Sequence, residues 1–254
     1  MAGRPPRTIA TEAIVLRRRP IGEADAVLTL LTLAEGRVDA VARGIRKPQA
    51  KLRGHLEPVT RSRLMLARGR SLDVVAQAET VDAYLSLKGD LDALAVALYC
   101  CELTELAAPA QTPQLELFHL LANLLSALDA GVRPASAARY FELHLLSAAG
   151  YELQVACCAS CGSELAEAES LFSAAAGGIL CPSCRAGATG RLLSVRAQKV
   201  LRYCGRSGLE EFCALRMPTE TDAEVRAALG EAVRTALDAE PRAAKFLDQL
   251  GERP

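Results

Sequence analysis

The chain has 254 residues, of which 50% are hydrophobic and 24% are charged, a composition typical of a folded globular protein. Its 30 basic and 30 acidic side chains cancel, yet residues 1–80 carry 15 Lys and Arg against 8 Asp and Glu, whereas residues 81–254 carry 15 against 22. No secretory signal follows the opening positive charges and no apolar run approaches the roughly 18 residues of a membrane span, so we expect a cytoplasmic protein with no membrane partner.

Residues 1–80 are predicted to form short strands joined by turns. Stretches rich in strand-forming residues recur at short intervals, over 13–16, 26–32, 37–43, 60–66 and 72–76. Glu35 and Gly36 suit a hairpin turn, and the basic stretch 44–54, which is poor in apolar residues, suits a loop. Five short strands at this spacing predict a small closed or nearly closed barrel, for which the oligonucleotide-binding (OB) fold is the usual candidate.

From residue 81 the apolar residues follow a helical period. Leu87, Leu91, Leu94 and Leu98 fall on one helical face, and the Leu-rich stretch 115–128 is expected to be buried nearly all round. Further helices are predicted over 134–149, 195–204 and 221–239, with a short last helix from 241 to about 250. The chain is therefore predicted to be α+β, with an OB-type barrel domain over 1–80 and an α-helical domain over 81–254.

Four cysteines in two matched pairs carry the strongest chemical signal. Cys158 and Cys161 form one C-x-x-C pair, and Cys181 and Cys184 form a second pair after nineteen intervening residues. Two such pairs aim four thiolates at one ion, the pattern of a structural zinc site. We therefore predict a zinc-ribbon insert at about 157–187 with one Zn²⁺ per chain, structural rather than catalytic because four thiolates leave no open coordination position.

Two other interpretations of these cysteines stay open. The C-x-x-C pairs are also compatible with a redox-active dithiol, or with four unrelated buried thiols. Cys157 adjoins Cys158 and is an alternative first ligand, although the C-x-x-C register favours Cys158. The remaining cysteines lie on helical patterns, where they are expected to be buried small hydrophobic residues.

A dense basic stretch points to nucleic acid. Between Arg37 and Arg70 there are ten Lys and Arg but only two acidic residues, Asp39 and Glu57. Such a patch neutralises phosphates, although a charge run is more often simply a solvated surface. The predicted DNA-binding residues are Arg17, Arg18, Arg37, Arg43, Arg46, Lys47, Lys51, Arg53, Arg61 and Arg63.

The barrel region lacks the residues that stack on bases. Residues 1–83 contain no Phe, Tyr or Trp, whereas barrels that hold single strands tightly use aromatic rings. The predicted grip is therefore directed at the backbone, sensitive to salt and tolerant of sequence, and it extends to duplex as well as single strands.

No catalytic motif is visible. There is no Gly-rich phosphate loop, nucleophile elbow or H-E-x-x-H pattern, and the three histidines, His55, His119 and His144, are far apart in sequence. The protein is therefore predicted not to be an enzyme.

Several motifs together resemble the bacterial DNA repair protein RecO family. In the barrel region these are Glu12–Leu16, the stretch Gly36–Lys47, and the pair of segments Leu52–Gly54 and Leu56–Pro58. In the helical region, Tyr140–Leu146 followed by Gly150-Tyr151 and the first cysteine pair is similar to the central signature of the family, as is Gly177–Cys181. The resemblance covers most of the chain in the right order and is loose only after about residue 205.

The resemblance implies a DNA repair and recombination mediator active in the DNA damage response. It implies binding of single- and double-stranded DNA, annealing of complementary strands, and work with RecR that helps RecA displace single-stranded DNA-binding protein (SSB). It also implies docking of the acidic SSB tail on the helical domain, with Arg139 as a candidate contact and a solvent-facing Arg139 as the alternative. Such a protein would work in the cytoplasm at the nucleoid.

Two competing functions stay open on the residues alone. One is a zinc-ribbon RNA-binding or transcription-associated regulatory protein that uses the same basic barrel. The other is a thiol-disulfide enzyme built on the two C-x-x-C pairs, which metal content and thiol reactivity would distinguish from a structural zinc protein.

Overall fold

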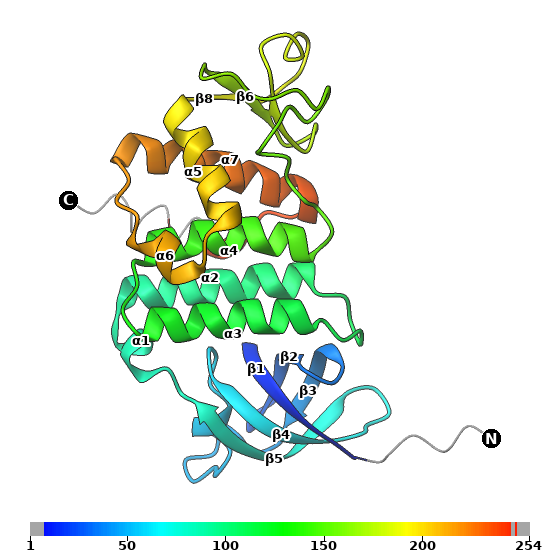
Figure 1. Cartoon of the computed structure of the whole chain (residues 1–254). Helices are drawn as coiled ribbons and strands as arrows, with labels where there is room; N and C mark the ends of the chain where they lie inside the picture. The colour runs from blue at the N-terminus through cyan, green and yellow to red at the C-terminus, as the bar shows by residue number, and fades with distance from the viewer. Residues whose placement is uncertain (1–7, 245–246, 248–254) are drawn as a thin grey trace. The chain divides into compact units, whose positions relative to one another are not determined.

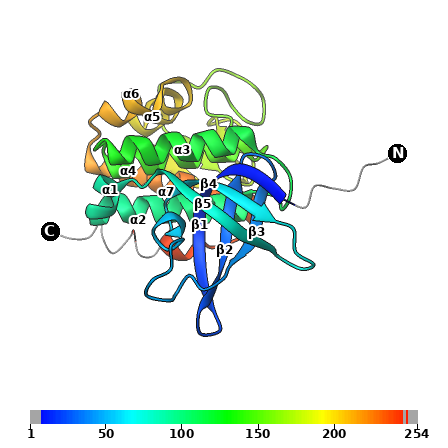
Figure 2. The same ribbon diagram turned by 90° about the horizontal axis from the view of Figure 1, so that it is seen from below.

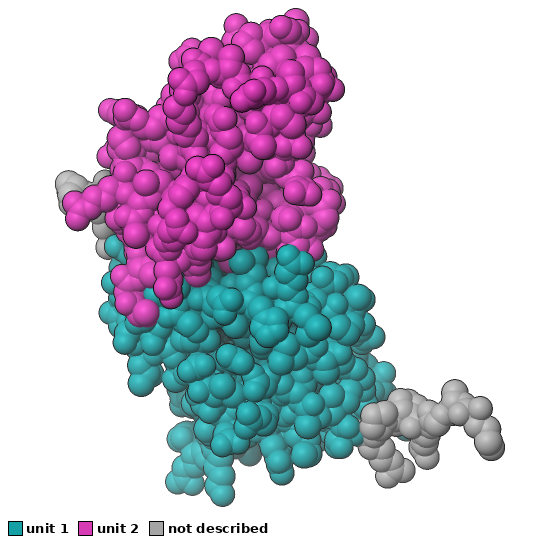
Figure 3. Space-filling view, in the orientation of Figure 1, with its two compact units in different colours: residues 1–129 teal, residues 130–254 magenta. Residues whose placement is uncertain are grey.

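The computed structural model describes residues 8–244 and residue 247, in two compact units. One unit is residues 1–129 and the other is residues 130–254, shown in separate colours in Figure 3. The predicted end of the last helix, near residue 250, lies outside the described residues. No helix within the described part of the chain is both long and apolar enough to cross a membrane.

The first unit begins with five strands that close into a barrel (Figures 1 and 2). These are β1 (Thr8–Ile21), β2 (Asp25–Thr32), β3 (Gly36–Ala42), β4 (Arg61–Ala67) and β5 (Asp73–Asp82), with a short 3-10 helix, η1 (Gly54–Leu56), before β4. The strand order is β1-β2-β3-β5-β4, antiparallel throughout except for a short parallel pairing of β3 with β5. The predicted five-stranded OB-type barrel is therefore confirmed.

The barrel interior is filled by the alternate residues of each strand. On β2 and β3 these inward residues are short and branched aliphatic side chains, as the period of two residues in a strand requires. Leu52 and Ala78 pack against the edge of this core. The buried core residues are Ala13, Val15, Ala26, Leu28, Leu30, Val38, Ala40, Ala42, Ile45, Leu56, Leu64, Leu66 and Val75.

Gly36 serves both as a turn residue and as a contact point. Its φ of +67° is in the left-handed region, as expected of the hairpin turn between β2 and β3. A Cβ atom at this position would lie 1.8 Å from the backbone oxygen of Thr112, because the segment just before Leu115 runs against the turn. Gln111 donates its backbone N–H to the Arg37 carbonyl at 3.0 Å in the same region.

Three helices complete the first unit: α1 (Leu85–Gly89), α2 (Leu91–Ala107) and α3 (Leu115–Asp129). Asp90 ends the first of them and caps the second, where its carboxylate accepts the backbone N–H groups of Asp92 and Ala93 at 2.9 Å. Helix α2 contacts β1. The Leu-rich helix predicted over 115–128 is present as α3, with eight buried residues. His119, Asn123 and Ser126 are exposed on its other face, so the expected burial nearly all round is wrong.

The leucine row predicted over 87–98 is not a single buried helical face. The Asp90 cap divides it between two helices, and Leu91 and Leu98 are 49% and 38% exposed. The buried residues of α2 are mainly small ones, such as Ala93, Ala97 and Cys100.

The second unit combines helices with a small sheet. Its helices are α4 (Pro134–Ala148), α5 (Val195–Arg206), α6 (Leu209–Ala214) and α7 (Thr219–Leu237). The sheet has the order β7-β6-β8 and consists of β6 (Ser170–Ser173), β7 (Gly178–Leu180) and β8 (Arg191–Leu193). Pro134 occupies the first turn of α4, and the Ser194 hydroxyl caps α5 by accepting the Ala197 N–H at 3.2 Å, as predicted for both starts.

Candidate nucleic-acid interface and metal centre

The loop that joins β3 to β4, residues 43–60, has a well-anchored backbone. The Arg46 N–H donates to the Ala24 carbonyl at 2.9 Å, and the Gly44 N–H donates to the Asp25 carboxylate at 2.7 Å. Ile45 and Leu56 are buried in the barrel core. These contacts hold the loop against the turn between β1 and β2. The backbone that carries the basic side chains of the loop is therefore fixed in position.

The five basic residues of this loop are exposed and carry no acidic partner within the described chain. Ion pairs within the described chain involve none of them, and the one hydrogen bond recorded for their side chains runs from Arg46 Nη1 to the Gly22 carbonyl at 3.0 Å. The five residues are Arg43, Arg46, Lys47, Lys51 and Arg53. Their charge is therefore open to an anionic ligand.

A β-bulge in β1 adds a sixth basic residue to this end of the barrel. Val15 pairs with Leu30, but the register then shifts past Leu16, and Arg18 pairs with Leu28. Because directly paired residues share one face of the sheet and both leucines belong to the barrel core, Arg18 lies on the inward-facing side at the end of the barrel. Without the bulge, strand alternation would have placed Arg17 there instead. Arg18 has no ion-pair partner within the described chain.

The other four predicted DNA-binding arginines are held by the protein. Arg17 forms an ion pair with the Glu105 carboxylate, and Arg37 donates from Nη1 to the Glu105 backbone oxygen. Both contacts fix α2, which carries Glu105, to the barrel strands. Sequence reasoning did not find this acidic residue because it lies 88 positions from Arg17.

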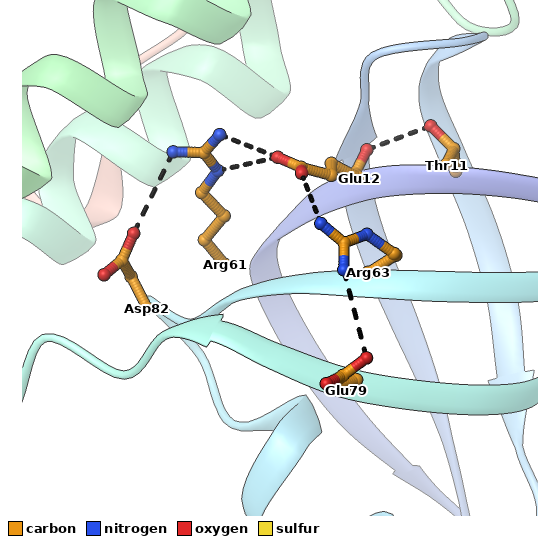
Figure 4. Close-up of polar contacts among 6 residues, drawn as sticks. All are labelled: Thr11, Glu12, Arg61, Arg63, Glu79 and Asp82. Atoms are coloured by element: carbon orange, nitrogen blue, oxygen red, sulfur yellow. Dashed lines mark hydrogen bonds and ion pairs between the residues drawn. The ribbon is translucent and has the colours of Figure 1, made fainter.

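The last two arginines belong to a charge network across β1, β4 and β5 (Figure 4). Arg61 donates from Nη2 and Nε to the Glu12 carboxylate at 2.7 and 3.0 Å, and Arg63 contacts the same carboxylate at 3.4 Å. Asp82 and Glu79 lie 3.9 Å from Arg61 and Arg63 respectively. The hydrogen bond from Arg61 holds the pKa of Glu12 below its usual value.

This network neutralises the arginines that it contains. Three carboxylates surround two guanidinium groups, and Arg61 also lies over the ring of Phe118 on α3, 5.8 Å from its centre. Of the ten predicted DNA-binding residues, the six that form neither an ion pair nor a hydrogen bond to Glu105 within the described chain lie at the end of the barrel where the 43–60 loop meets the β1–β2 turn.

The two cysteine pairs come together in the second unit. The sulfur atoms of Cys158, Cys161, Cys181 and Cys184 all lie within 4.8 Å of one another, and Cys161 Sγ is 3.9 Å from Cys181 Sγ. Tetrahedral Zn–S bonds of about 2.3 Å would separate neighbouring sulfurs by about 3.8 Å, so the cluster has the size of a four-thiolate metal site. Cys157 is half-buried and lies outside this cluster.

Backbone donors favour the thiolate form at the first knuckle. The backbone N–H of Cys181 donates to Cys158 Sγ at 3.4 Å, and this bond, with that from Cys161, lowers the pKa of Cys158 to about 6. A hydrogen bond with the Ser163 side chain lowers the pKa of Cys161 in the same way. A metal ligand must be deprotonated, so these donors suit the first cysteine pair to a cation, whereas hydrogen bonds with Cys161 and Cys181 raise the pKa of Cys184 to about 12.

Gln198 joins the cysteine insert to α5. Its fully buried amide donates to the Ala168 carbonyl, just before β6, at 2.9 Å and to the Leu193 carbonyl, at the end of β8, at 3.1 Å. The sequence did not predict that Gln198 is buried, because a glutamine on a helix is usually exposed.

Arg139 lies inside the second unit and not at its surface. It is 6% exposed and forms an ion pair of 2.9 Å with Glu142, one helical turn further along α4. The alternative of a solvent-facing Arg139 is therefore wrong, because α4 turns this side chain inward beside Cys204 of α5. Four further cysteines lie outside the cluster and are buried, as predicted: Cys100, Cys101, Cys204 and Cys213.

This architecture defines a protein with an OB-type barrel, a basic loop at one end of that barrel, and a separate helical unit with a four-cysteine cluster. Two family models match the chain in the same order: the N-terminal part of recombination protein O over residues 7–84 and its C-terminal part over residues 88–245. The chain therefore belongs to the RecO family of DNA repair proteins, and the resemblance noted in the sequence is confirmed.

Curated relatives agree over nearly the whole length. The chain is 35% identical over 245 residues to a DNA repair protein RecO of Dehalococcoides mccartyi strain CBDB1, covering 96% of this chain and 97% of that protein. It is 41% identical over 247 residues to that of Roseiflexus sp. strain RS-1, covering 96% of this chain and 86% of the relative.

Proposed function

We propose that this protein is a non-enzymatic mediator of DNA repair and recombination that binds single- and double-stranded DNA and anneals complementary strands. One observation carries the proposal. Of the ten predicted DNA-binding residues, six form no ion pair with any residue that the structure describes and lie together at one end of the barrel, whereas four are engaged by the protein itself.

Annealing requires that the repulsion between two phosphate backbones be screened. A basic surface without acidic partners lowers this repulsion by displacing counterions, and it needs no nucleotide hydrolysis to do so. The absence of aromatic residues over 1–83 leaves phosphate contacts as the main source of affinity. Such a surface accepts many sequences, which suits a protein that brings together whichever strands are complementary.

We further propose that the four-cysteine cluster holds one structural Zn²⁺. Cys158, Cys161, Cys181 and Cys184 would supply four thiolates, which close the coordination shell and leave the ion no position for a substrate. Bound there, zinc would contribute folding energy to the insert rather than reaction chemistry.

The partners implied by the family are RecR, SSB and, indirectly, RecA, and we propose that the protein works with them at SSB-coated DNA in the nucleoid. The contact of an acidic SSB tail with Arg139 stays a prediction. Because this guanidinium is buried against Glu142, such a tail would have to compete with an existing ion pair.

The DNA-binding proposal is tested by reversing charge on the loop. Replacing Arg43, Arg46, Lys47 and Lys51 by Glu should slow annealing of complementary oligonucleotides at low salt by more than about tenfold, since each phosphate contact contributes to a salt-dependent affinity. The matched control replaces Arg196, Lys199, Arg216 and Arg234, four exposed residues of the second unit, by Glu. Unchanged annealing by the loop variant would contradict the assignment, and a strong preference of the native protein for structured RNA would favour the RNA-binding alternative.

A further inference from the structure

A hollow of about 460 Å³ lies at the end of the barrel where the unpaired basic residues gather. Three of its six lining residues are arginines, Arg18 from β1 with Arg46 and Arg53 from the 43–60 loop. The other three, Pro20, Ala26 and Ile45, form an apolar floor. None of the described residues that line it is acidic.

The three arginines reach the hollow for separate structural reasons. The bulge at Leu16 turns Arg18 to the inner side of β1. The hydrogen bond from Arg46 Nη1 to the Gly22 carbonyl fixes the direction of that guanidinium and leaves its other N–H groups free. Arg53 directly precedes η1, whose Leu56 is anchored in the barrel core.

Three like charges around one apolar floor are unfavourable without a counter-charge. Glu23 and Glu57 lie nearest in the chain to Arg18 and Arg53, but among the described residues neither forms an ion pair with an arginine of the hollow. Asp25 accepts the Gly44 N–H. An anion with several oxygen acceptors would satisfy all three guanidinium groups at once.

We propose that this hollow seats one backbone phosphate of a nucleic-acid strand, held jointly by Arg18, Arg46 and Arg53. The inference rests on the proposed DNA-binding function and refines it from a diffuse basic surface to a defined phosphate position. The volume accommodates a phosphate with its flanking sugars, and the floor offers no aromatic ring for a base to stack on. The exposed residues Arg43, Lys47 and Lys51 then attract the neighbouring phosphates at the open surface, outside the hollow.

The test compares two adjacent arginines on the same strand. Arg18→Gln should weaken binding of a single-stranded oligonucleotide by about tenfold, as expected for the loss of a charge-assisted contact. The matched control is Arg19→Gln, which removes the same charge one residue along, on the opposite face of β1, outside the hollow. Arg19→Gln should leave affinity nearly unchanged, and Arg18→Lys, which keeps the charge but loses the planar fork, should fall between the two.

Sharing of one phosphate predicts coupling between the arginines. If Arg18→Gln and Arg53→Gln each lower affinity by about tenfold, the double variant should lose clearly less than the roughly hundredfold that independent contacts would give. A strand with neutral methylphosphonate linkages should bind native protein and the Arg18→Gln variant equally. Thermal unfolding of every variant checks that the fold is retained.

The outcomes separate this inference from the proposed function. Failure of the native protein to bind charged strands at low salt would overturn the function itself. Native binding with equal losses in Arg18→Gln and Arg19→Gln, or strictly additive losses in the double variant, would overturn the phosphate seat alone. An Arg18→Gln effect that persists on the neutral strand would show that the hollow takes something other than a phosphate.

Discussion

At the residue scale, single carboxylates decide which arginines of the barrel are free. Glu12 engages both Arg61 and Arg63, while Glu105 engages Arg17 through its carboxylate and Arg37 through its backbone oxygen. The loop residues have no such partner among the described residues. Strong local positive charge at the barrel end is therefore a consequence of where the acidic residues lie, as much as of where the basic ones do.

Glu12 is expected to make stability depend on pH. Its pKa is lowered in the folded protein, mainly by the hydrogen bond from Arg61, so its contribution is fully present above the usual value of 4.5 and is lost as the pH falls through the lower folded pKa. Glu12→Gln should therefore lower the free energy of unfolding by about 1 kcal/mol at neutral pH and by less in acid. Urea unfolding at the two pH values measures the difference. Glu23→Gln, at the exposed β1–β2 turn, is the matched control and should leave the free energy of unfolding nearly unchanged at neutral pH.

Gly36 should tolerate no side chain. Gly36→Ala combines left-handed strain with a Cβ only 1.8 Å from the Thr112 oxygen, whereas Gly22→Ala has similar strain, at a φ of +57°, and no atom within 4 Å. We expect Gly22→Ala to destabilise the protein by about 1 kcal/mol and Gly36→Ala by at least about 2 kcal/mol more. Equal unfolding free energies for the two variants would contradict the close approach of the Thr112 backbone to Gly36.

At the element scale, the cysteine insert depends on its attachment to α5. Gln198→Leu should lower the free energy of unfolding by about 2 kcal/mol, because the Ala168 and Leu193 carbonyls would lose their buried donor. Chemical denaturation measures this loss. The adjacent Lys199→Gln removes only an exposed ion pair with Glu167 and should leave the unfolding midpoint unchanged. If both variants unfold alike, Gln198 does not hold the insert.

Metal removal should act on the same element. Cys161→Ser should lower the metal content of purified protein well below one ion per chain and make the insert sensitive to protease, since metal binding and local folding are coupled. Cys157→Ser, four residues away and outside the cluster, should keep the full metal content. Loss of metal from the Cys157 variant alone would reverse the ligand assignment.

At the scale of the whole molecule, the barrel is completed by helices beyond its own strands. Ile14 and Leu31 pair directly across β1 and β2 and are fully buried, yet they are not part of the barrel core cluster. Their cover comes from the rest of the compact unit 1–129, in which α2 contacts β1. The predicted domain boundary at residue 80 stays a prediction, while the compact unit extends to residue 129.

Separate fragments test where independent folding ends. A fragment of residues 1–129 should unfold cooperatively and at higher urea concentration than a fragment of residues 1–84, because the shorter one exposes the apolar pair Ile14 and Leu31. Circular dichroism during urea titration gives both midpoints. Coincident midpoints would favour the boundary at residue 80.

Local patterns in the sequence determined the OB-type barrel, the helical remainder, the four-cysteine cluster and the basic loop. Each of these features depends on residues that are close together in the sequence: strand and helix periods, C-x-x-C spacing, and a run of Lys and Arg without acids. These signals also sufficed for the family, since its motifs occur in order along the chain.

Only the tertiary structure decided which charges are available. Glu12 and Arg61 are 49 positions apart, and Arg17 and Glu105 are 88 apart, so no local pattern could reveal that these arginines are already paired. The bulge that turns Arg18 inward has no signature in Leu16 either, because strand alternation alone assigns Arg17 to that face. Ion pairing and strand register depend on contacts between distant segments, and these contacts exist only once the chain has folded.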